Sequence, residues 1–270
     1  MKGSDFFRHF FSMPVLLSAI FCLLFSGYVS ANTNAHVNRV AKNGEPDFEL
    51  PLCIHLFDDL EMQKKNVLMR NWVKPVDLQN IVLPEVNRIW SQAGIAFRIK
   101  SLSAVSIQGA PDRDSIIDYV VKAHRNSVGK SDPERIKKLL QLIDTDLEET
   151  NCIHVYLLPY LGETSQGNTR RKARRIFVAS WTDKPSGARL PPEHVRLIEK
   201  GSFVDGSMAR TLAHELGHLL GLKHPDKKTQ AEYGLLMGGR MPAYTLRISE
   251  INSARNQAAA LAEAFQQSAD

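Results

Sequence analysis

The chain has 270 residues and a formal net charge of +5. This length is enough for one domain with a good core and is short of what two independent domains usually need. The positive excess is mild and the chain has neither internal repeats nor a glycine-rich phosphate loop, so nucleic acid is not an expected partner.

The first 31 residues are expected to be a signal peptide and not part of the fold. Lys2 and Arg8 supply a positive start, residues 13–25 form an apolar run too short to span a membrane comfortably, and residues 29–31 have the small-residue spacing of a signal-peptidase site. Cleavage there predicts an exported bacterial protein, periplasmic or secreted, with no stable membrane span. An uncleaved N-terminal anchor is the alternative.

A folded domain is expected at residues 50–270, after a polar, mobile arm at residues 32–49. The domain opens with residues 50–57, an apolar run with β-branched and aromatic side chains. Such a run predicts a strand near the middle of a sheet, with His55 in a structural role.

A helix is predicted at residues 76–93, ended by Gly94. Its apolar face consists of Val82, Val86, Ile89 and Trp90. Pro84 lies in the interior of this segment, where it lacks a donor and its ring crowds the preceding turn, so it predicts a kink or a later start of the helix.

The remaining elements follow from apolar runs and helical periodicity. Strands are predicted at residues 97–107, 152–161, 175–181 and 194–203, and helices at residues 115–125, 134–149 and 249–267. The helical stretch at 108–150 is an insertion, which either covers a cleft or a partner or packs on the sheet as a helical hairpin. His154 is expected to be structural.

Two features leave alternatives open. Cys53 and Cys152 both open strand-like runs, so they are either a disulfide between neighbouring strands, as export would favour, or a pair of buried free thiols. Residues 170–175 concentrate five cationic side chains, which either attract an acidic partner or form a solvated loop that protects a strand edge.

Residues 214–224, HELGHLLGLKH, fit the pattern H-E-x-x-H-x-x-G-x-x-H. On an α-helix His214 and His218 are four residues apart, so both imidazoles lie on one face and reach a single ion. Gly221 lies where the helix should end, because glycine adopts the left-handed conformation without a Cβ penalty, and the turn returns His224 as a third ligand. Three protein nitrogens predict one catalytic Zn²⁺ with a fourth position for water.

Glu215 follows the first histidine, about 100° round the helix axis, which keeps it out of the ligand set but close enough to bond a water. That is the place of a general base. A structural zinc is usually closed by four ligands that include cysteines, and no cysteine lies near this motif. The alternative, a helix with surface histidines, becomes rare once the glycine and the third histidine are also required.

The eleven-residue motif resembles that of the metzincin clan of zinc endopeptidases, in its matrixin-like or related secreted bacterial forms. Those proteins have a methionine turn below the metal, and Met237, in a glycine-flanked turn 13 residues after His224, is the candidate for it. Met241 is the competitor. Gly239 stands where two branches of the clan carry a tyrosine, so no tyrosine role is transferred.

The resemblance implies a zincin-like α+β fold with an α/β-type upper half: a twisted mixed sheet of about five strands, an active-site helix, a methionine turn and a C-terminal helix. It also implies that strand 175–181 is the edge strand that lines the cleft, where an extended protein or peptide substrate pairs through main-chain hydrogen bonds.

The activity that the resemblance implies is hydrolysis of peptide bonds by a zinc-activated water, with Glu215 as general base. A non-catalytic zinc-binding interaction domain of the same fold, acting in the cell envelope, is the alternative. Retention of Glu215 argues against it, because a binding site needs only the histidines.

Overall fold

The computed structural model describes nine stretches of the chain: residues 45–64, 67–71, 73–106, 113–114, 151–161, 167–179, 208–226, 234–238 and 244–268. All of them belong to the unit Arg39–Asp270. The predicted signal peptide at 1–31, the helices at 115–125 and 134–149 and the strand at 194–203 lie outside these stretches. Among the described residues, no helix is both long and apolar enough to cross a bilayer.

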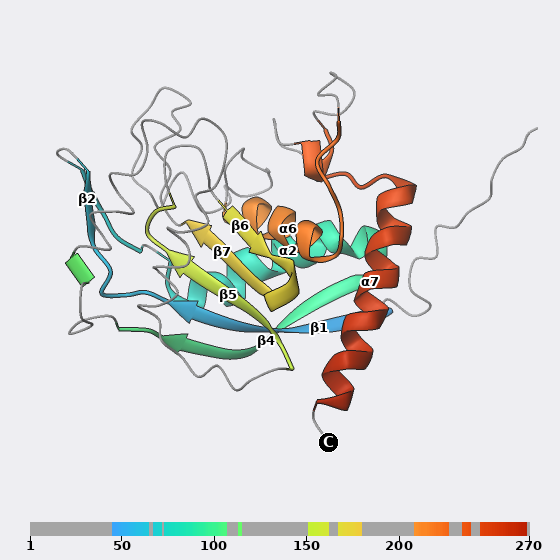
Figure 1. The fold of residues 1–270 in the computed structure, drawn as a ribbon, viewed down its shortest axis with the longest axis horizontal. Coiled ribbons are helices and arrows are strands. Elements are labelled where there is room, and N and C mark those ends of the chain that lie inside the picture. The colour runs from blue at the N-terminus through green and yellow to red at the C-terminus, as the bar shows by residue number, and fades with distance from the viewer. Residues whose placement is uncertain are drawn as a thin grey trace, which may run out of the picture. The chain divides into compact units, whose positions relative to one another are not determined.

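A five-stranded sheet forms the centre of the described structure, as Figure 1 shows. In spatial order its strands are β4 (Ile95–Ala104), β1 (Phe48–Leu56), β5 (Ile153–Leu158), β7 (Arg175–Ala179) and β6 (Gly167–Arg170). The first four are parallel to one another, and β6 runs antiparallel to β7. The predicted mixed sheet of about five strands is therefore confirmed, and a separate hairpin of β2 (Met62–Lys64) and β3 (Val67–Met69) adds to it.

Strand β1 is an inner strand, between β4 and β5, and its side chains are buried on both faces of the sheet. Leu50, Leu52, Ile54 and Leu56 enter the main core, and the alternate residues Cys53 and His55 are buried on the opposite face. A strand that is covered on both faces reads as a continuous apolar run, which is why it could be located from sequence. It begins at Phe48, two residues before the predicted start of the domain.

The prediction that strand 175–181 is the edge strand is wrong. Strand β7 lies between β5 and β6, so the outermost strand of the described sheet on this side is β6. The sequence of β6, Gly-Asn-Thr-Arg, contains no apolar side chain, and all four residues are half-buried. An edge strand tolerates such a composition, and no hydrophobic period reveals it.

The predicted helix at residues 76–93 is composed of four short segments. They are α1 (Pro75–Asp77), the π-helical turn η2 (Leu78–Val82), α2 (Leu83–Trp90) and the 3-10 turn η3 (Ser91–Ala93). The N–H of Leu83 donates to the carbonyl of Leu78, so the turn widens just before Pro84, which then lies in the first turn of α2, where no donor is needed. Gly94 ends the segment with a left-handed φ of 65°.

Two helices lie side by side on one face of the sheet (Figure 1): α2, and α6 (Met208–Leu219), which carries the histidine motif. Trp90 of α2 is fully buried, and its indole N–H donates to the carbonyl of Ala213 at 3.2 Å. Because Ala213 directly precedes His214, this bond ties the start of the motif to α2.

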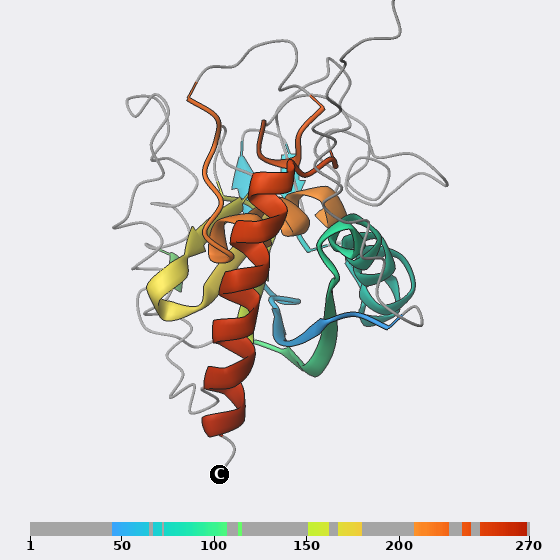
Figure 2. The same ribbon diagram turned by 90° about the vertical axis from the view of Figure 1, so that its right-hand side faces the viewer.

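The C-terminal helix α7 (Ile248–Gln267) confirms the predicted terminal helix and packs across β1 and η3. In Figure 2 it runs beside the hairpin of β6 and β7, whose turn contains the 3-10 segment η4 (Arg171–Ala173). Arg171 donates to Gln257 at 2.5 Å, and the guanidinium of Arg174 lies 5.0 Å from the ring centre of Phe265. Part of the cationic segment 170–175 therefore joins this turn to α7.

Cys53 and Cys152 form a disulfide with a Cα–Cα distance of 5.9 Å. Strand β1 pairs directly with β5, and Cys53 lies opposite His154 in that pairing, so the two thiols meet across neighbouring strands. Of the two alternatives that the sequence left open, the structure selects the disulfide.

Candidate metal centre

The histidine motif changes direction at Gly221. The N–H of Leu222 donates to the carbonyl of Gly217 at 2.8 Å, and that of Gly221 to the carbonyl of His218 at 3.1 Å. With Gly221 at a φ of 87°, these two bonds form a Schellman motif, which ends a helix and reverses the chain. The reversal brings His224 back beside the last turn of α6.

The three imidazoles meet through their Nε2 atoms. His224 Nε2 lies 2.9 Å from His214 Nε2 and 3.0 Å from His218 Nε2. The rings approach from different directions, with an interplanar angle of 90° between His214 and His218 and of 44° and 53° to His224. Three nitrogens aimed at one point from three sides are the first requirement of a metal site.

The other ring nitrogen of two of these histidines bonds to a backbone carbonyl. Nδ1 of His214 donates to Leu236 O at 2.8 Å, and Nδ1 of His218 donates to Leu222 O at 3.0 Å. A carbonyl only accepts, so the proton of each neutral ring is on Nδ1 and the lone pair on Nε2 faces the meeting point. The three Nε2 atoms thus bring together more lone pairs than protons, an arrangement that a cation resolves.

This donor set fits zinc. Zinc binds neutral imidazole nitrogens at about 2.0–2.1 Å, and tetrahedral geometry then spaces two such nitrogens about 3.3 Å apart. The observed separations of 2.9 and 3.0 Å are close to that spacing. His214, His218 and His224 would hold the ion, and a fourth position would remain for water or substrate.

Burial keeps the imidazoles of His214 and His218 in the neutral form, which binds a metal. It lowers the pKa of His214 to about 3, with help from the positive charge of neighbouring His218, and it also lowers the pKa of His218. His214 is buried, His218 is half-buried and His224 is exposed. The site therefore reaches from the core, at His214, to the solvent, at His224.

Glu215 is buried beside the histidines, and β6 supplies its neighbours. The hydroxyl of Thr169 lies 2.6 Å from Oε2 of Glu215 and 2.9 Å from its backbone carbonyl. Burial raises the pKa of Glu215 to about 7, against the opposing effect of the hydrogen bond from Thr169. A carboxyl group with a pKa in this range exchanges a proton readily near neutral pH.

Thr169 and Gly167 were not predicted from the sequence. They stand two residues apart on β6, with their Cα–Cβ directions toward the same face of the sheet. A Cβ atom at Gly167 would lie 2.5 Å from both Cγ and Oε1 of Glu215. No local pattern reveals these contacts, because they join residues 46 or more positions apart in the chain.

A 3-10 turn, η6 (Leu236–Gly238), contains the candidate methionine of the predicted methionine turn and lies against α6. Met237 is buried, and a Cβ atom at Gly217 would lie 2.7 Å from its sulfur. The carbonyl of Leu236 accepts from His214 and also from the buried guanidinium of Arg210 at 3.3 Å. The turn thus orients one histidine directly. The competitor Met241 lies outside the described residues.

Neither a protein-family model nor a curated protein sequence matches the chain. Among solved structures, a zinc-dependent peptidase from Methanocorpusculum labreanum is similar over 77% of this chain and 99% of its own, at 14% identity and a TM-score of 0.34. A chaperone–substrate complex is similar over 81% of this chain at 12% identity and a TM-score of 0.37, and this chain spans 35% of that one. The geometry of the histidines therefore carries the functional assignment.

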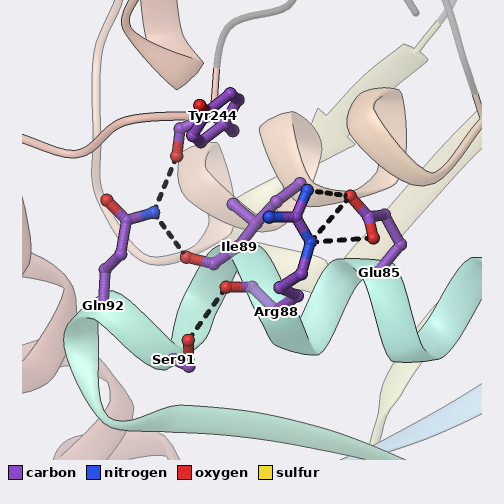
Figure 3. A network of polar contacts seen from close by, with 6 residues as sticks. All are labelled: Glu85, Arg88, Ile89, Ser91, Gln92 and Tyr244. Atoms are coloured by element: carbon purple, nitrogen blue, oxygen red, sulfur yellow. Dashed lines mark hydrogen bonds and ion pairs between the residues drawn. The ribbon is translucent and has the colours of Figure 1, made fainter. Parts of the chain in front are cut away.

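Gln92 joins α2 to residues 244–246, and Figure 3 shows its bonds to Ile89 and Tyr244. Its amide nitrogen donates to Tyr244 O at 2.7 Å and to Ile89 O at 2.8 Å, and its amide oxygen accepts from Leu246 N at 3.3 Å. Thr245, between these two partners, accepts from the N–H of Leu236 at 2.9 Å. Gln92 thus supports the turn whose carbonyl orients His214.

A second group with metal-ligating side chains is Cys53, Cys152 and His154, on the opposite face of the sheet from α6. Both sulfurs are in the disulfide, so they are not available as thiolate ligands.

Proposed function

We propose that this chain is an exported zinc-dependent endopeptidase. The observation that carries the proposal is the convergence of three Nε2 atoms, two of them with Nδ1 bonded to backbone carbonyls, beside a buried glutamate. A site that only binds zinc needs no such carboxyl group. A site that hydrolyses amide bonds needs a group that takes a proton from water and gives one to the leaving amine.

The residues divide the work as follows. His214, His218 and His224 hold the ion, which when bound lowers the pKa of a water and polarises the carbonyl of the peptide bond. Glu215 accepts the proton of the attacking water and returns it to the amine as the bond breaks. The turn at Met237 keeps His214 in its ligating orientation through the carbonyl of Leu236.

We further propose that the substrate is an extended protein or peptide segment that runs along β6. This strand is the outermost of the described sheet on the side of α6, and two of its residues adjoin Glu215. A peptide that pairs with a strand edge gains main-chain hydrogen bonds without a sequence requirement. The position of β6 supports this role better than that of β7, where the sequence had suggested it.

Export is supported by the disulfide between Cys53 and Cys152. Disulfides form and persist in oxidising compartments such as the periplasm and the extracellular space. The predicted signal peptide at residues 1–31 accounts for the same destination.

The proposal is tested with Glu215→Gln, which keeps the size and polarity of the side chain but removes the base. The purified mature chain is incubated with a denatured protein mixture, and cut sites are mapped by mass spectrometry. Wild type is expected to cleave and to lose activity with a chelator, and the variant to lose at least about 100-fold in kcat with zinc still bound. An unchanged cleavage rate in the variant would exclude Glu215 as the general base. A well-folded wild type that binds zinc and cleaves no peptide would exclude the endopeptidase and favour the interaction domain.

A further inference from the structure

The carboxyl group of Glu215 is enclosed by two residues of β6, one on each side. The hydroxyl of Thr169 lies 2.6 Å from Oε2. Gly167, which has no side chain, leaves the space that Cγ and Oε1 of Glu215 occupy. Because the two residues are separated by one position on a strand, their Cα atoms present the same face to α6. One short strand therefore contacts the carboxyl group of Glu215, which transfers the proton in the proposed reaction.

The contacts of Thr169 are unusual in that both acceptors belong to the same residue. Its hydroxyl reaches the side-chain carboxyl of Glu215 at 2.6 Å and the backbone carbonyl of Glu215 at 2.9 Å. A glutamate side chain has three rotatable bonds and populates several staggered rotamers when unrestrained. The single proton of this hydroxyl serves one acceptor or the other, and both contacts need the rotamer in which the carboxyl group lies near the backbone carbonyl of Glu215.

Gly167 restricts the carboxyl group sterically. A Cβ atom at this position would lie 2.5 Å from Cγ and Oε1 and 2.7 Å from Cδ of Glu215, distances at which one of the groups must move. Cγ is not the flexible end of the side chain, so an added methyl group would displace the whole carboxyl group. Glycine is required at this position for close approach, and the described backbone there has no left-handed φ.

From these contacts we propose that Thr169 and Gly167 are positioning residues that set the rotamer of Glu215. The inference rests on the proposed function for its consequence, since a general base must stand within hydrogen-bond reach of the proton it takes, about 2.6–3.2 Å. Small errors in such a position are costly to the rate. The bond from Thr169 is expected to act on kcat and not on zinc binding, because the contacts that carry the proposal are with Glu215 and not with the histidines.

The main test compares Thr169→Val, which replaces the hydroxyl by a methyl group of the same shape, with Thr169→Ser, which keeps the hydroxyl. For the valine variant we expect kcat to fall roughly 10- to 100-fold, the range of a hydrogen bond to a charged group. KM, zinc content and Tm are expected to stay near the wild-type values. The serine variant is expected to recover most of the lost kcat.

Crystal structures of the same variants with zinc give a readout that does not depend on activity. In Thr169→Ser the carboxyl group of Glu215 is expected in its wild-type rotamer, and in Thr169→Val it is expected to rotate away from residue 169. If the carboxyl group moves while wild type cleaves no substrate, positioning stands and the endopeptidase proposal falls. If it stays in place and kcat changes by less than about twofold, or if both variants lose the same activity, positioning by Thr169 is excluded.

Gly167→Ala provides an independent test through sterics, and Gly234→Ala is its matched control, since a Cβ atom at Gly234 meets nothing within 4 Å. We expect Gly167→Ala to displace the carboxyl group and to lower kcat at least about 10-fold, with zinc retained, and the control to keep full activity. An unchanged kcat in Gly167→Ala would contradict the steric half of the proposal.

Discussion

Two pairs of histidines in this protein use the same side chain in opposite ways. His55 and His154 lie on neighbouring parallel strands, and their rings are stacked with an interplanar angle of 14° and centroids 5.4 Å apart. His214 and His218 lie one turn apart on α6, and their rings are perpendicular with centroids 4.8 Å apart. Both pairs have a buried member, so burial alone does not distinguish them.

The difference comes from the backbone that carries each pair. Side chains on one face of a sheet stand roughly parallel, so the rings stack, and the nitrogens of His55 bond to Ser103 and His154 at 3.1 Å each. A helix followed by a glycine turn delivers imidazoles from several directions, and their Nε2 atoms then share one point. The strand pair thus bonds its histidines to each other and to Ser103, whereas the helix and turn aim the Nε2 lone pairs of His214 and His218 at the point where His224 also arrives.

The largest expected effect is a loss of stability when the disulfide next to His154 is removed. It tests whether the region of His55 and His154 is independent of the region of His214 and His218. Replacing Cys53 and Cys152 by alanine removes a crosslink between residues 99 positions apart, which should lower the free energy of unfolding by about 2–5 kcal/mol. Chemical denaturation measures the loss. Zinc content of the folded fraction is expected to equal that of wild type, and a parallel loss of zinc would show that the two faces of the sheet are not independent.

The second prediction concerns the exposed histidine of the metal centre. His224→Ala should weaken zinc binding by more than about 100-fold, since even partners one bond beyond the ligands are worth about 10–100-fold. Competition with a chromophoric chelator measures the affinity. His154→Gln is the matched control on the other face, and it should keep wild-type affinity. Equal affinity in His224→Ala and wild type would remove this residue from the ligand set.

The third prediction concerns the pH dependence of stability that results from the buried His55. Burial, the neighbouring His154 and the charge of Arg175 lower the pKa of His55 from 6.5 to about 4. Between these two values the unfolded chain binds a proton at His55 that the folded chain does not. His55 therefore does not reduce the free energy of unfolding above about pH 6.5, and it reduces it progressively as the pH decreases toward 4.

Denaturation of wild type and His55→Gln across this range measures the contribution of His55. The glutamine variant cannot titrate, and its stability should fall less steeply over the same window. Other histidines, including His214, contribute to the slope in both proteins, so the difference between the two curves is the quantity that tests His55. Parallel curves would contradict the prediction.

The smallest effect is expected from a methyl group under the metal centre. Gly217→Ala places a Cβ atom 2.7 Å from the sulfur of Met237, and the resulting overpacking of about 1–3 kcal/mol is partly offset by the better helix propensity of alanine, about 1 kcal/mol. A net loss of about 1 kcal/mol in unfolding free energy is therefore expected. Gly234→Ala should change stability by less than about 0.5 kcal/mol, and thermal unfolding compares the two.

Much of the fold followed from periodicity. The apolar run at residues 50–57 predicted β1, the apolar face from Val82 to Trp90 predicted α2, and the recurring alanines predicted α7. Each of these elements is buried on one or both faces over many residues, so its sequence has a clear period. Strand β6 was missed because four polar residues at a sheet edge carry no such pattern. The error about the edge strand came from the resemblance, which assigned that place to residues 175–181. Strand β6, which takes the place in the structure, has no apolar pattern that could have corrected the assignment.

The ligand set of the candidate site was visible in the sequence for a different reason. Helical spacing and one glycine bring His214, His218 and His224 together within eleven residues, so local geometry alone predicts their convergence. The residues that surround this set were not visible. Thr169 and Gly167 contact Glu215, the carbonyl of Leu236 accepts from His214, and Gln92 supports the turn at Leu236. All of them lie in distant parts of the chain, and no spacing rule relates them to the histidines.

By itself, the sequence determined that His214, His218 and His224 converge, because helix pitch and the left-handed freedom of Gly221 act over a few residues. Only the tertiary structure decided that the two cysteines pair, that β6 and not β7 is the outer strand, and that Glu215 is held between Thr169 and Gly167. Those outcomes depend on which strands become neighbours, and strand neighbours are chosen by burial of the whole sheet and not by any segment alone.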